Sequence, residues 1–555
     1  MIKPILFSER GHLARNPYKL AGGQDARAPS HLIDNQHPRE KHQMQAKLPD
    51  HRLPAPLLLA VALLTFSGCT VGPDFIRPDK PAVKTYTEQA QAEQAVKALK
   101  LGKDMPGQWW ALFHSKPLNA LIEQAIKHNA DLQTAYATLV QAQENALSKQ
   151  GSLWPSLDAG AYTTRQQVAG AQFGNPSFGG SVFSLYNTSI ALSYNLDVFG
   201  GIKRQIEVLS AQAEYQRFQL EGAFLTIASN IVTTAVQEAA TRAQIAATQE
   251  MIAAQSQQLA VIKQQFDLGS IAKTAVLAQQ SALEQTKTAL PPLQQQLAQL
   301  RNRLKVLVGE FPNSQLAAQF QLEDLILPTE LPLSVPSKLV EQRPDIRAQE
   351  AMLHAASAQV GVVIASVFPD FTLRANVASI ATETASLFTP GSQIWNMTAN
   401  LAQPVFSGGK LTHQRSLAKA AYQQVAEQYR STVLKAFENV ADTLTALQYD
   451  AESLKTQASA EQAAHDTLAL TESQFQLGAV SYLDLLTAQR NFQQARIGKI
   501  QAKANQIADT AGLFLALGGG WWQRPELSKT LQDMQPKAKP AGSWLEQFEQ
   551  FRTGK

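Results

Sequence analysis

Apolar and polar side chains alternate with a period of two in several stretches of about ten residues, the pattern of β-strands with unlike faces. In residues 189–198, Leu192 and Leu196 lie on one face, and Ser193 and Asn195 lie on the other. Four strands are expected on this basis, over residues 155–166, 186–199, 369–380 and 394–406.

Two environments fit strands of this kind. Runs of about ten residues with one apolar and one polar face are typical of transmembrane β-strands. The same pattern suits a half-exposed sheet in a soluble domain. The segments between paired strands, residues 165–185 and 379–393, are rich in Gly, Ser, Phe and Pro, which indicates surface loops.

The pattern becomes helical after each pair of strands. Residues 202–265 contain no Pro and a single Gly, Gly222, which predicts one helix about 95 Å long at 1.5 Å per residue. Residues 411–474 predict a second helix of similar length. Each is expected to end in a tight Leu-Gly turn followed by a returning helix, which Pro291 and Pro292 break in the first case.

The same elements occur twice because the chain is an internal duplication. The stretch NADLQTAYATLVQAQ around Asp131 matches RPDIRAQEAMLHAAS around Asp345, a shift of 214 residues (345 − 131). FDLGSIAKTAVLAQQ from Phe266 matches FQLGAVSYLDLLTAQ from Phe475, a shift of 209 residues (475 − 266). Both matches occur in the same order, which indicates two structural repeats of one fold.

Four strands per chain cannot form a closed barrel. Lipid does not tolerate the two unpaired edges of an open sheet, and barrels of this kind begin at about eight strands. Cyclic assembly of identical chains solves the problem. The expected fold is therefore a mixed α and β chain whose trimer forms a twelve-stranded β-barrel, four strands per chain, continued by a long α-helical barrel. Two copies would give about eight strands with little lumen.

Cys69 is the only cysteine of the 555 residues, and it follows an apolar run at residues 57–66. Lys47 and Arg52 supply positive charge upstream, which is the order of a bacterial secretion signal. The run of about 10 residues is too short to span a bilayer as a helix. With a cysteine at the cleavage position the pattern resembles a lipoprotein signal, so Cys69 is expected to carry lipid as the first mature residue. The alternative is a lone buried cysteine.

Composition excludes several functions. Charged residues make up 17% of the chain and the net charge is +4, so no nucleic-acid partner is expected. A single cysteine excludes intrachain disulfides and cysteine-rich metal sites. The sequence contains no HExxH motif and no GxGxxG after a strand, and Gly408-Gly409-Lys410 lacks the remainder of a phosphate loop. No cofactor, no metal site and no enzymatic activity are expected.

Six stretches together resemble the outer membrane factor family, the TolC-like exit ducts of tripartite efflux pumps and type I secretion systems. The lipid-anchored drug-efflux branch is the most similar. The stretches are CTVGPDF from Cys69, WWALFHSKPLNALIEQAIKHN from Trp109, VPSKLVEQRPDI from Val335, FSGGK from Phe406, FQLGAVSYLDLLTAQ from Phe475 and LALGGGWW from Leu515. They cover most of residues 69–522, and their combination is specific although no single one is.

The resemblance implies a homotrimer in the outer membrane that is anchored by lipid and extends into the periplasm. It implies passive export of drugs or other small molecules through the lumen, with an inner-membrane pump supplying energy and a periplasmic adaptor joining pump to duct. A lipid-anchored periplasmic coiled-coil scaffold is the alternative, which the alternating strands at equivalent points of both repeats disfavour. The expected division is an extension from an upstream start codon (1–43), a lipoprotein signal peptide (44–68), an anchor and linker (69–108), two repeats (109–310 and 311–522) and a tail (523–555).

In the family, the Leu-Gly turns form the periplasmic tip, where the duct narrows and the adaptor docks. A role in the turn alone is the alternative, because only Gly readily takes the positive φ of so sharp a reversal. The matching positions are Phe266, Leu268, Gly269, Phe475, Leu477 and Gly478.

Asp484 on the second tip matches an aspartate that lines the constriction in some relatives. Three copies around an axis would place three carboxylates together, which favours cations; the alternative is a solvated helix carboxylate. The tyrosine, arginine and aspartate lock of some relatives is absent, because its positions hold Phe475, Val480 and Ala275. Lys273 is the nearest cation of the first hairpin and is expected to pair with Asp484 as the gate.

Four polar residues of the predicted strands are expected to face the barrel lumen. Simple solvation explains them as well as a role in selectivity does. They are Asn195, Asp197, Arg374 and Asn376.

Overall fold

The computed structural model describes residues 70–87, 99–169, 171, 174, 180–316 and 318–534. All of them belong to the larger of the two compact units of the chain, Phe66–Lys555. Cys69, the expected signal peptide, the expected extension at 1–43 and most of the C-terminal tail lie outside the described residues.

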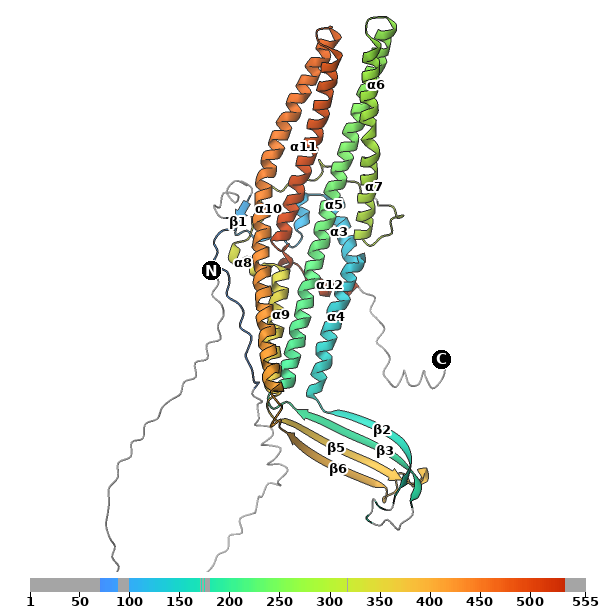
Figure 1. The fold of residues 1–555 in the computed structure, drawn as a ribbon, viewed down its shortest axis with the longest axis vertical. Coiled ribbons are helices and arrows are strands. Elements are labelled where there is room, and N and C mark those ends of the chain that lie inside the picture. The colour runs from blue at the N-terminus through green and yellow to red at the C-terminus, as the bar shows by residue number, and fades with distance from the viewer. Residues whose placement is uncertain are drawn as a thin grey trace, which may run out of the picture. The chain divides into compact units, whose positions relative to one another are not determined.

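Both repeats contribute to one antiparallel sheet, whose strand order is β2-β3-β5-β6 (Figure 1). The four predicted strands are confirmed, although β3 begins and ends earlier than expected and takes up part of the loop predicted at 165–185. Within the described residues, the outer edges of the first and last strands have no partner strand. The strands are β2 (Ser156–Val168), β3 (Ser181–Leu196), β5 (Asp370–Ala381) and β6 (Gln393–Ala402).

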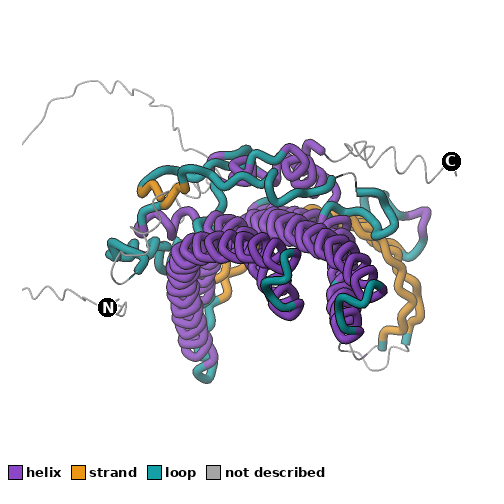
Figure 2. The backbone as a smooth tube through the Cα atoms, turned by 90° about the horizontal axis from the view of Figure 1, so that it is seen from above, coloured by secondary structure: helices purple, strands orange, loops and turns teal. Residues whose placement is uncertain are grey.

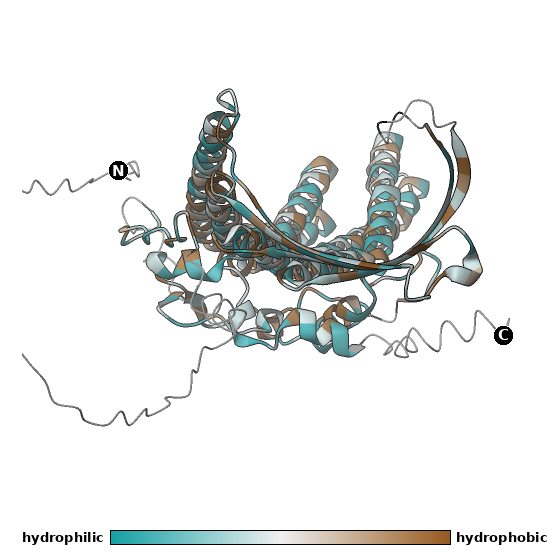
Figure 3. Cartoon of the chain, turned by 90° about the horizontal axis from the view of Figure 1, so that it is seen from below, coloured by the Kyte–Doolittle hydropathy of each residue, from teal (hydrophilic) through white to brown (hydrophobic). Residues whose placement is uncertain are grey.

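The register of the sheet separates an apolar face from a polar face. Leu157 pairs with Leu192, Leu192 with Ala375, and Ala375 with Met397. Directly paired residues share a face, so these rows run across all four strands of the curved sheet (Figure 3). The apolar face, as the name is used below, consists of Leu157, Ala159, Ile190, Leu192, Tyr194, Leu196, Phe371, Leu373, Ala375, Val377, Trp395, Met397, Ala399 and Leu401.

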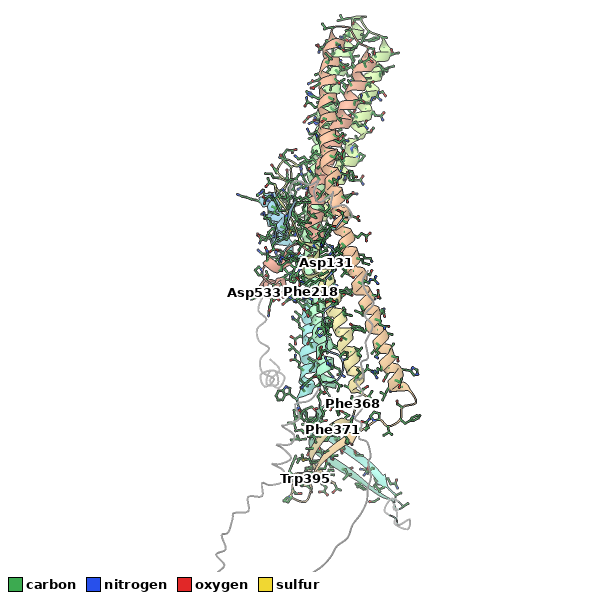
Figure 4. The ribbon with its side chains drawn as sticks, turned by 90° about the vertical axis from the view of Figure 1, so that its left-hand side faces the viewer. Asp131, Phe218, Phe368, Phe371, Trp395 and Asp533 are labelled. Carbon is green, nitrogen blue, oxygen red and sulfur yellow. The ribbon has the colours of Figure 1, made fainter. Side chains whose placement is uncertain are left out.

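Large side chains of the apolar face are solvent-exposed in the single chain. Trp395 is 78% exposed and Met397 is 74% exposed. A contiguous apolar surface of this kind marks a site that contacts another protein or a membrane. Aromatic rings join the face to the helices, since Phe199 stacks on Phe368 at 4.7 Å and contacts Phe371 at 6.5 Å. Figure 4 shows Phe368 and Phe371 at this junction and Trp395 further along the sheet.

Two helices of 67 residues follow the strand pairs, α5 (Gly201–Asp267) and α10 (Lys410–Gln476). Each starts after a glycine with positive φ, Gly200 or Gly409, which reverses the chain from strand to helix. The two long predicted helices are thus confirmed and extend slightly past their expected ends. In the described part of the chain, no helix combines the length and hydropathy that a bilayer crossing demands.

The return helices differ between the repeats, as the prolines predict. In the first repeat α6 (Lys273–Thr288) gives way to α7 (Leu290–Leu307), which starts with Pro291 and Pro292 in its first turn. In the second repeat α11 (Tyr482–Ala516) is continuous over 35 residues. Seen from above, the two resulting hairpins stand side by side in a curved row of helices (Figure 2).

Shorter elements surround the middle of this row. Trp109 and Phe113 pack against Phe514 of α11 at ring distances of 5.4 and 6.2 Å, within the hydrophobic core. A two-stranded parallel sheet also lies here, which the sequence did not predict. The elements are α3 (Lys116–His128), α4 (Ala130–Gln150), α8 (Pro336–Gln342), α9 (Pro344–Ala365), α12 (Leu527–Met534), β1 (Leu99–Leu101) and β4 (Leu331–Leu333).

The duplication is visible in equivalent hydrogen bonds between the short and the returning helices. Asn129, before α4, donates through Nδ2 to the carbonyl of Leu307 at 2.8 Å. Arg343, before α9, donates through Nη1 to the carbonyl of Ala516 at 3.0 Å. Each pair is related by the two sequence shifts, 214 and 209 residues. An amide in one repeat and a guanidinium in the other therefore satisfy the same orphan carbonyl at a helix end.

Candidate functional site

Three of the four residues predicted for the lumen share the polar face of the sheet. Arg374 of β5 pairs with Ser193 and Thr398, and Asn195 pairs with Thr372, two residues from Arg374 on the same side. Asn376 lies on this side as well, two residues further along β5. The sheet thus brings Asn195, Arg374 and Asn376 together on the face opposite the apolar one.

Asp197, the fourth of these residues, lies just beyond the end of β3 and caps a helix. Its Oδ1 accepts a hydrogen bond from the backbone N–H of Ile202, and its Oδ2 accepts one from Lys203, both at 2.8 Å. The first amides of a helix have no intrahelical acceptor, and a carboxylate there also complements the helix dipole. Asp197 therefore starts α5, a role that the sequence analysis did not predict.

The first described residues after Cys69 are fixed where β3 meets α5. The N–H of Val71 donates to the carbonyl of Phe199 at 3.2 Å. Thr70 packs so closely on Gly200 that a Cβ added to this glycine would lie 2.3 Å from Thr70 Cγ2. The chain that leaves Cys69 is therefore held at the junction of sheet and helices.

Arg204, in the first turn of α5, holds the same segment through its buried guanidinium. The group donates to the carbonyls of Val71 at 3.1 Å and Gly72 at 3.4 Å. It also contacts the carboxylates of Asp74 and Glu207, each at 2.7 Å. Burial opposes the charge, but the two carboxylates outweigh it and raise the pKa of Arg204. We call residues 70–87 the N-terminal strap.

The two hairpin tips have the same backbone geometry. Gly269 (φ +74°) donates to the carbonyl of Phe266 at 2.8 Å, and Gly478 (φ +72°) donates to the carbonyl of Phe475 at 3.0 Å. In each tip the residue after the glycine closes a second bond to the carbonyl five residues earlier, which completes a Schellman motif. The predicted positive φ at both glycines is confirmed.

The leucines of the tips point into solvent. Leu268 is 84% exposed and Leu477 is 82% exposed, and Phe266 is exposed to a smaller extent. Phe475 instead packs its ring against the edge of Tyr482, at a centroid distance of 5.8 Å. Each tip therefore presents a bare leucine on a rigid turn.

Asp484 takes part in a capping box at the start of α11. Its Oδ2 accepts from the backbone N–H of Ser481 at 2.9 Å and from Ser481 Oγ at 2.6 Å. These hydrogen bonds hold the pKa of Asp484 below its usual range. The first hairpin has Ala272 and Ala275 at the equivalent positions and no side-chain cap. Both gate candidates are described residues, and no ion pair joins Lys273 to Asp484 within the chain.

A hydrogen bond that sequence reasoning missed joins the two hairpins near their tips. The hydroxyl of Tyr482, the first residue of α11, donates to Oε1 of Gln279 on α6. Gln279 Nε2 in turn donates to the carbonyl of Gln255 on α5 at 2.7 Å. No local pattern predicts this contact, because Tyr482 and Gln279 are 203 residues apart in sequence.

A pair of carboxyl groups between α10 and α11 was also missed. Burial, together with a hydrogen bond and the charge of Asp509, raises the pKa of Asp450 to about 7. Asp450 is therefore expected to hold a proton in the acidic range, and the stability of the second hairpin is expected to depend on pH.

A cavity of about 460 Å³ opens between α5, α9, α10 and α11. Its polar lining includes Asp345, Asn439 and Asp442. Gly222 and Gly512 also line it, and a Cβ added to either would meet no atom closer than 3.8 Å. Packing within the chain therefore does not explain these two helical glycines.

The sheet with unlike faces, the paired helical hairpins and the duplication define a known class. The chain belongs to the outer membrane efflux protein family, whose model matches residues 121–310 and 335–519, once in each repeat. It is 30% identical over 421 residues to the pyoverdine export outer membrane protein OpmQ of Pseudomonas aeruginosa, covering 75% of this chain and 87% of that protein. It is 27% identical over 480 residues to the cation efflux system protein CusC of Escherichia coli, covering 85% of this chain and 100% of that protein.

Solved structures have the same fold. The outer-membrane channel OprN superposes with a TM-score of 0.75 at 25% identity, covering 82% of this chain and 100% of OprN. The CmeC outer membrane channel of Campylobacter jejuni superposes with a TM-score of 0.77 at 20% identity, covering 85% of this chain and 100% of CmeC. The sequence resemblance to outer membrane factors is thereby confirmed.

Proposed function

We propose that three copies of this chain form a passive exit duct across the outer membrane, the channel component of a tripartite efflux system. The observation that carries the proposal is the four-stranded sheet with one apolar face, one polar face and two unpaired edges. In the trimer the β6 edge of one chain pairs with the β2 edge of the next, which gives a closed barrel of about twelve strands. The apolar face meets lipid, and Asn195, Arg374 and Asn376 line the water-filled lumen.

The helices continue the duct into the periplasm. α5 and α10 are each about 100 Å long at 1.5 Å per residue, so three pairs of hairpins form a helical barrel below the sheet. Export through it is passive, because an inner-membrane pump supplies the energy and a periplasmic adaptor joins pump to duct. The two repeats, 109–310 and 311–522, each contribute two strands and one helical hairpin.

Lipid on Cys69 fits the position of the N-terminal strap. Thr70 and Val71 are held at the junction of β3 and α5, which is the level at which the barrel leaves the membrane. Acyl chains on the preceding residue therefore reach the inner leaflet without any further chain length. Two or more acyl chains on one residue give stable anchoring, since each buried CH₂ contributes about 0.8 kcal/mol.

The hairpin tips dock the periplasmic adaptor and close the duct. Leu268 and Leu477 are exposed on turns held by Gly269 and Gly478, which suits insertion into an apolar groove of the adaptor together with Phe266 and Phe475. Asp484 and Lys273 lie beside these turns, and we assign them to the constriction, where Lys273 of one hairpin pairs with Asp484 of another.

The cargo is a drug, a small organic molecule or an ion that the pump selects. The relatives support this range, because their names cover pyoverdine export and cation efflux. Nothing in the described residues groups three or more metal-ligating side chains.

Substitutions on opposite faces of β6 test the barrel. Met397 and Asn396 are neighbours on the two faces, near the middle of the strand. A Lys on the lipid face of a barrel costs about 2–4 kcal/mol near the bilayer centre, and one in the lumen costs little. Met397→Lys is expected to remove the protein from the outer-membrane fraction, while Asn396→Lys remains there as a trimer. Equal behaviour of the two variants would contradict the proposed orientation.

A further inference from the structure

The cavity between α5, α9, α10 and α11 lies where two helices of the second repeat meet end to end. The last turn of α11 and the first turn of α9 both line it, and Arg343 joins them by donating to the carbonyl of Ala516. Residues of α5 and α10 form its sides. Its volume of about 460 Å³ is within the range of sites for small organic molecules, roughly 300–1,000 Å³.

The cavity opens toward the concave face of the row of helices. Its wall includes the buried Leu225, and a Cβ added to Gly519 would lie 2.2 Å from Leu225 Cδ1, so this wall adjoins the turn that leads to α12. Figure 2 shows the shorter elements on the convex side of the row. Asn439 and Asp442 are exposed and therefore mark the mouth. In the proposed duct the concave face lines the lumen, so the cavity is open to passing molecules.

One carboxylate of the cavity has no partner. Asp345 forms a two-bond ion pair with Arg343, at 3.0 Å from Nε to Oδ1 and 2.7 Å from Nη2 to Oδ2, so these two charges compensate each other. Asp442 forms neither a hydrogen bond nor an ion pair with any described residue. The cavity therefore carries one uncompensated negative charge, and Leu225 and Leu515 give it apolar walls. This combination suits a molecule with one positive charge on an apolar body.

The duplication does not account for these features. The shift of 209 residues relates Asp442 to Thr233 and Gly512 to Arg303, so the first repeat has neither the carboxylate nor the bare backbone at these positions. Gly is unfavourable inside a helix such as α11. A Cβ added to Gly512 would meet no atom closer than Thr443 Cγ2 at 3.8 Å. The packing of the helices therefore leaves the space beside Gly512 available to a ligand.

We propose that this cavity binds small organic cations, molecules with a primary ammonium or guanidinium group on an apolar body, on their way through the duct. Asp442 accepts hydrogen bonds from the charged group, and Asn439 beside it offers a further polar contact. The apolar body lies beside Gly512, against Leu225 and Leu515. The inference rests on the proposed duct function, since it names one class of cargo that the lumen would hold. Hydrogen bonds between an ammonium and a carboxylate are stronger than those between neutral groups, which gives the site its preference for cations.

A matched pair of probes tests the role of charge. Naphthylmethylamine is positively charged at neutral pH, whereas naphthylmethanol has the same ring and no charge. In isothermal titration calorimetry of the purified protein in detergent, the amine is expected to bind about tenfold more tightly than the alcohol, the effect of one charged hydrogen bond. Asp442→Asn should abolish this difference. The control is Glu438→Gln, which neutralises an exposed carboxylate one turn earlier on α10 and should leave the difference unchanged.

A second variant, Gly512→Arg, tests the role of space. It introduces the residue that the first repeat has at the equivalent position, so α11 is expected to tolerate it. The long side chain would occupy the cavity and bring a positive charge to Asp442, so both probes should lose at least about tenfold in affinity. Gly512→Ala adds only a Cβ with room around it and should bind the amine as the wild type does. Unchanged melting temperatures confirm that the variants are folded.

The outcomes distinguish the cavity from the duct, because binding is measured without any current. Equal affinities for the amine and the alcohol would overturn the proposed site, as would binding that Asp442→Asn and Gly512→Arg both leave unchanged. Either result is compatible with conducting pores in planar bilayers, which would keep the duct. Binding that depends on charge and is lost in both variants would support the site, and particles with this binding that never conduct would reject the duct alone.

Discussion

The N-terminal strap gives the sharpest quantitative prediction, through Arg204. The side chain of Arg204 is 4% exposed, whereas its partner Asp74 is 91% exposed. An ion pair with so solvated a carboxylate contributes at most about 1 kcal/mol. The carbonyls of Val71 and Gly72 should therefore account for most of what Arg204 contributes to holding the strap.

The expected magnitude follows from these bonds. Hydrogen bonds of charged groups contribute about 1.5–3 kcal/mol net, and the low end applies here because the bond to Gly72 is as long as 3.4 Å. Arg204→Ala should therefore weaken the strap locally by about 2–3 kcal/mol. At 1.36 kcal/mol per factor of ten, this raises the population of the detached strap about 30- to 150-fold. Asp74→Ala should raise it less than about fivefold.

Hydrogen exchange measured by mass spectrometry provides the assay. The amides of residues 71–86 should exchange faster in Arg204→Ala by the factor above, while peptides from α10 remain protected as in the wild type. Equal effects of Arg204→Ala and Asp74→Ala would show instead that the exposed ion pair supplies most of the stabilisation of the strap.

Four further substitutions test the helices and their ends. Ser481→Ala removes the capping box of α11 and should lower the local stability at the second tip by about 1 kcal/mol, measured by exchange of the first α11 amides. Gly269→Ala should cost about 1–2 kcal/mol through its positive φ alone. Gly309→Ala should lower the melting temperature more, because its Cβ would also lie 2.2 Å from the carbonyl of His128. The pKa of Asp450 rises from 3.8 to about 7 on folding, so its protonation favours the folded state below about pH 4. This contribution is lost as the pH rises through about 7. The melting temperature of Asp450→Asn should therefore depend less on pH between about 4 and 7 than that of the wild type.

Much of the fold was predictable because its signals are local. The period of two predicts the strands, the absence of Pro predicts the long helices, and the Leu-Gly pairs predict the turns. Each of these signals can be recognised within one continuous segment of the sequence. The break at Pro291 followed from the missing amide of proline. The duplication then placed every element twice, so that one correct assignment supported its copy.

The site was predictable only where its residues belong to such patterns. Asn195 and Arg374 lie on one face because strand alternation dictates it. The capping role of Asp197 was not predicted, because it depends on β3 ending at Leu196, one residue earlier. The bond from Tyr482 to Gln279 was not predicted, because it depends on how the two hairpins lie side by side. No periodic pattern in the sequence gives that arrangement.

The lipid on Cys69 and the pairing of Lys273 with Asp484 stay predictions. Cys69 lies outside the described residues, and the strap that follows it supplies the supporting geometry. Lys273 lies on the first hairpin and Asp484 on the second, and they do not form an ion pair within one chain. Their proposed pairing therefore involves hairpins of neighbouring chains. A double-mutant cycle on conductance would show no coupling if this pairing is absent.

In the proposed assembly, three identical chains close one conducting pore. The most direct test is single-channel recording of the purified protein in planar bilayers, on particles whose chains are counted by native mass spectrometry. Particles of three chains are expected to give discrete current steps. Folded particles of a single chain, or trimers that never conduct, would show that identical chains do not close a pore.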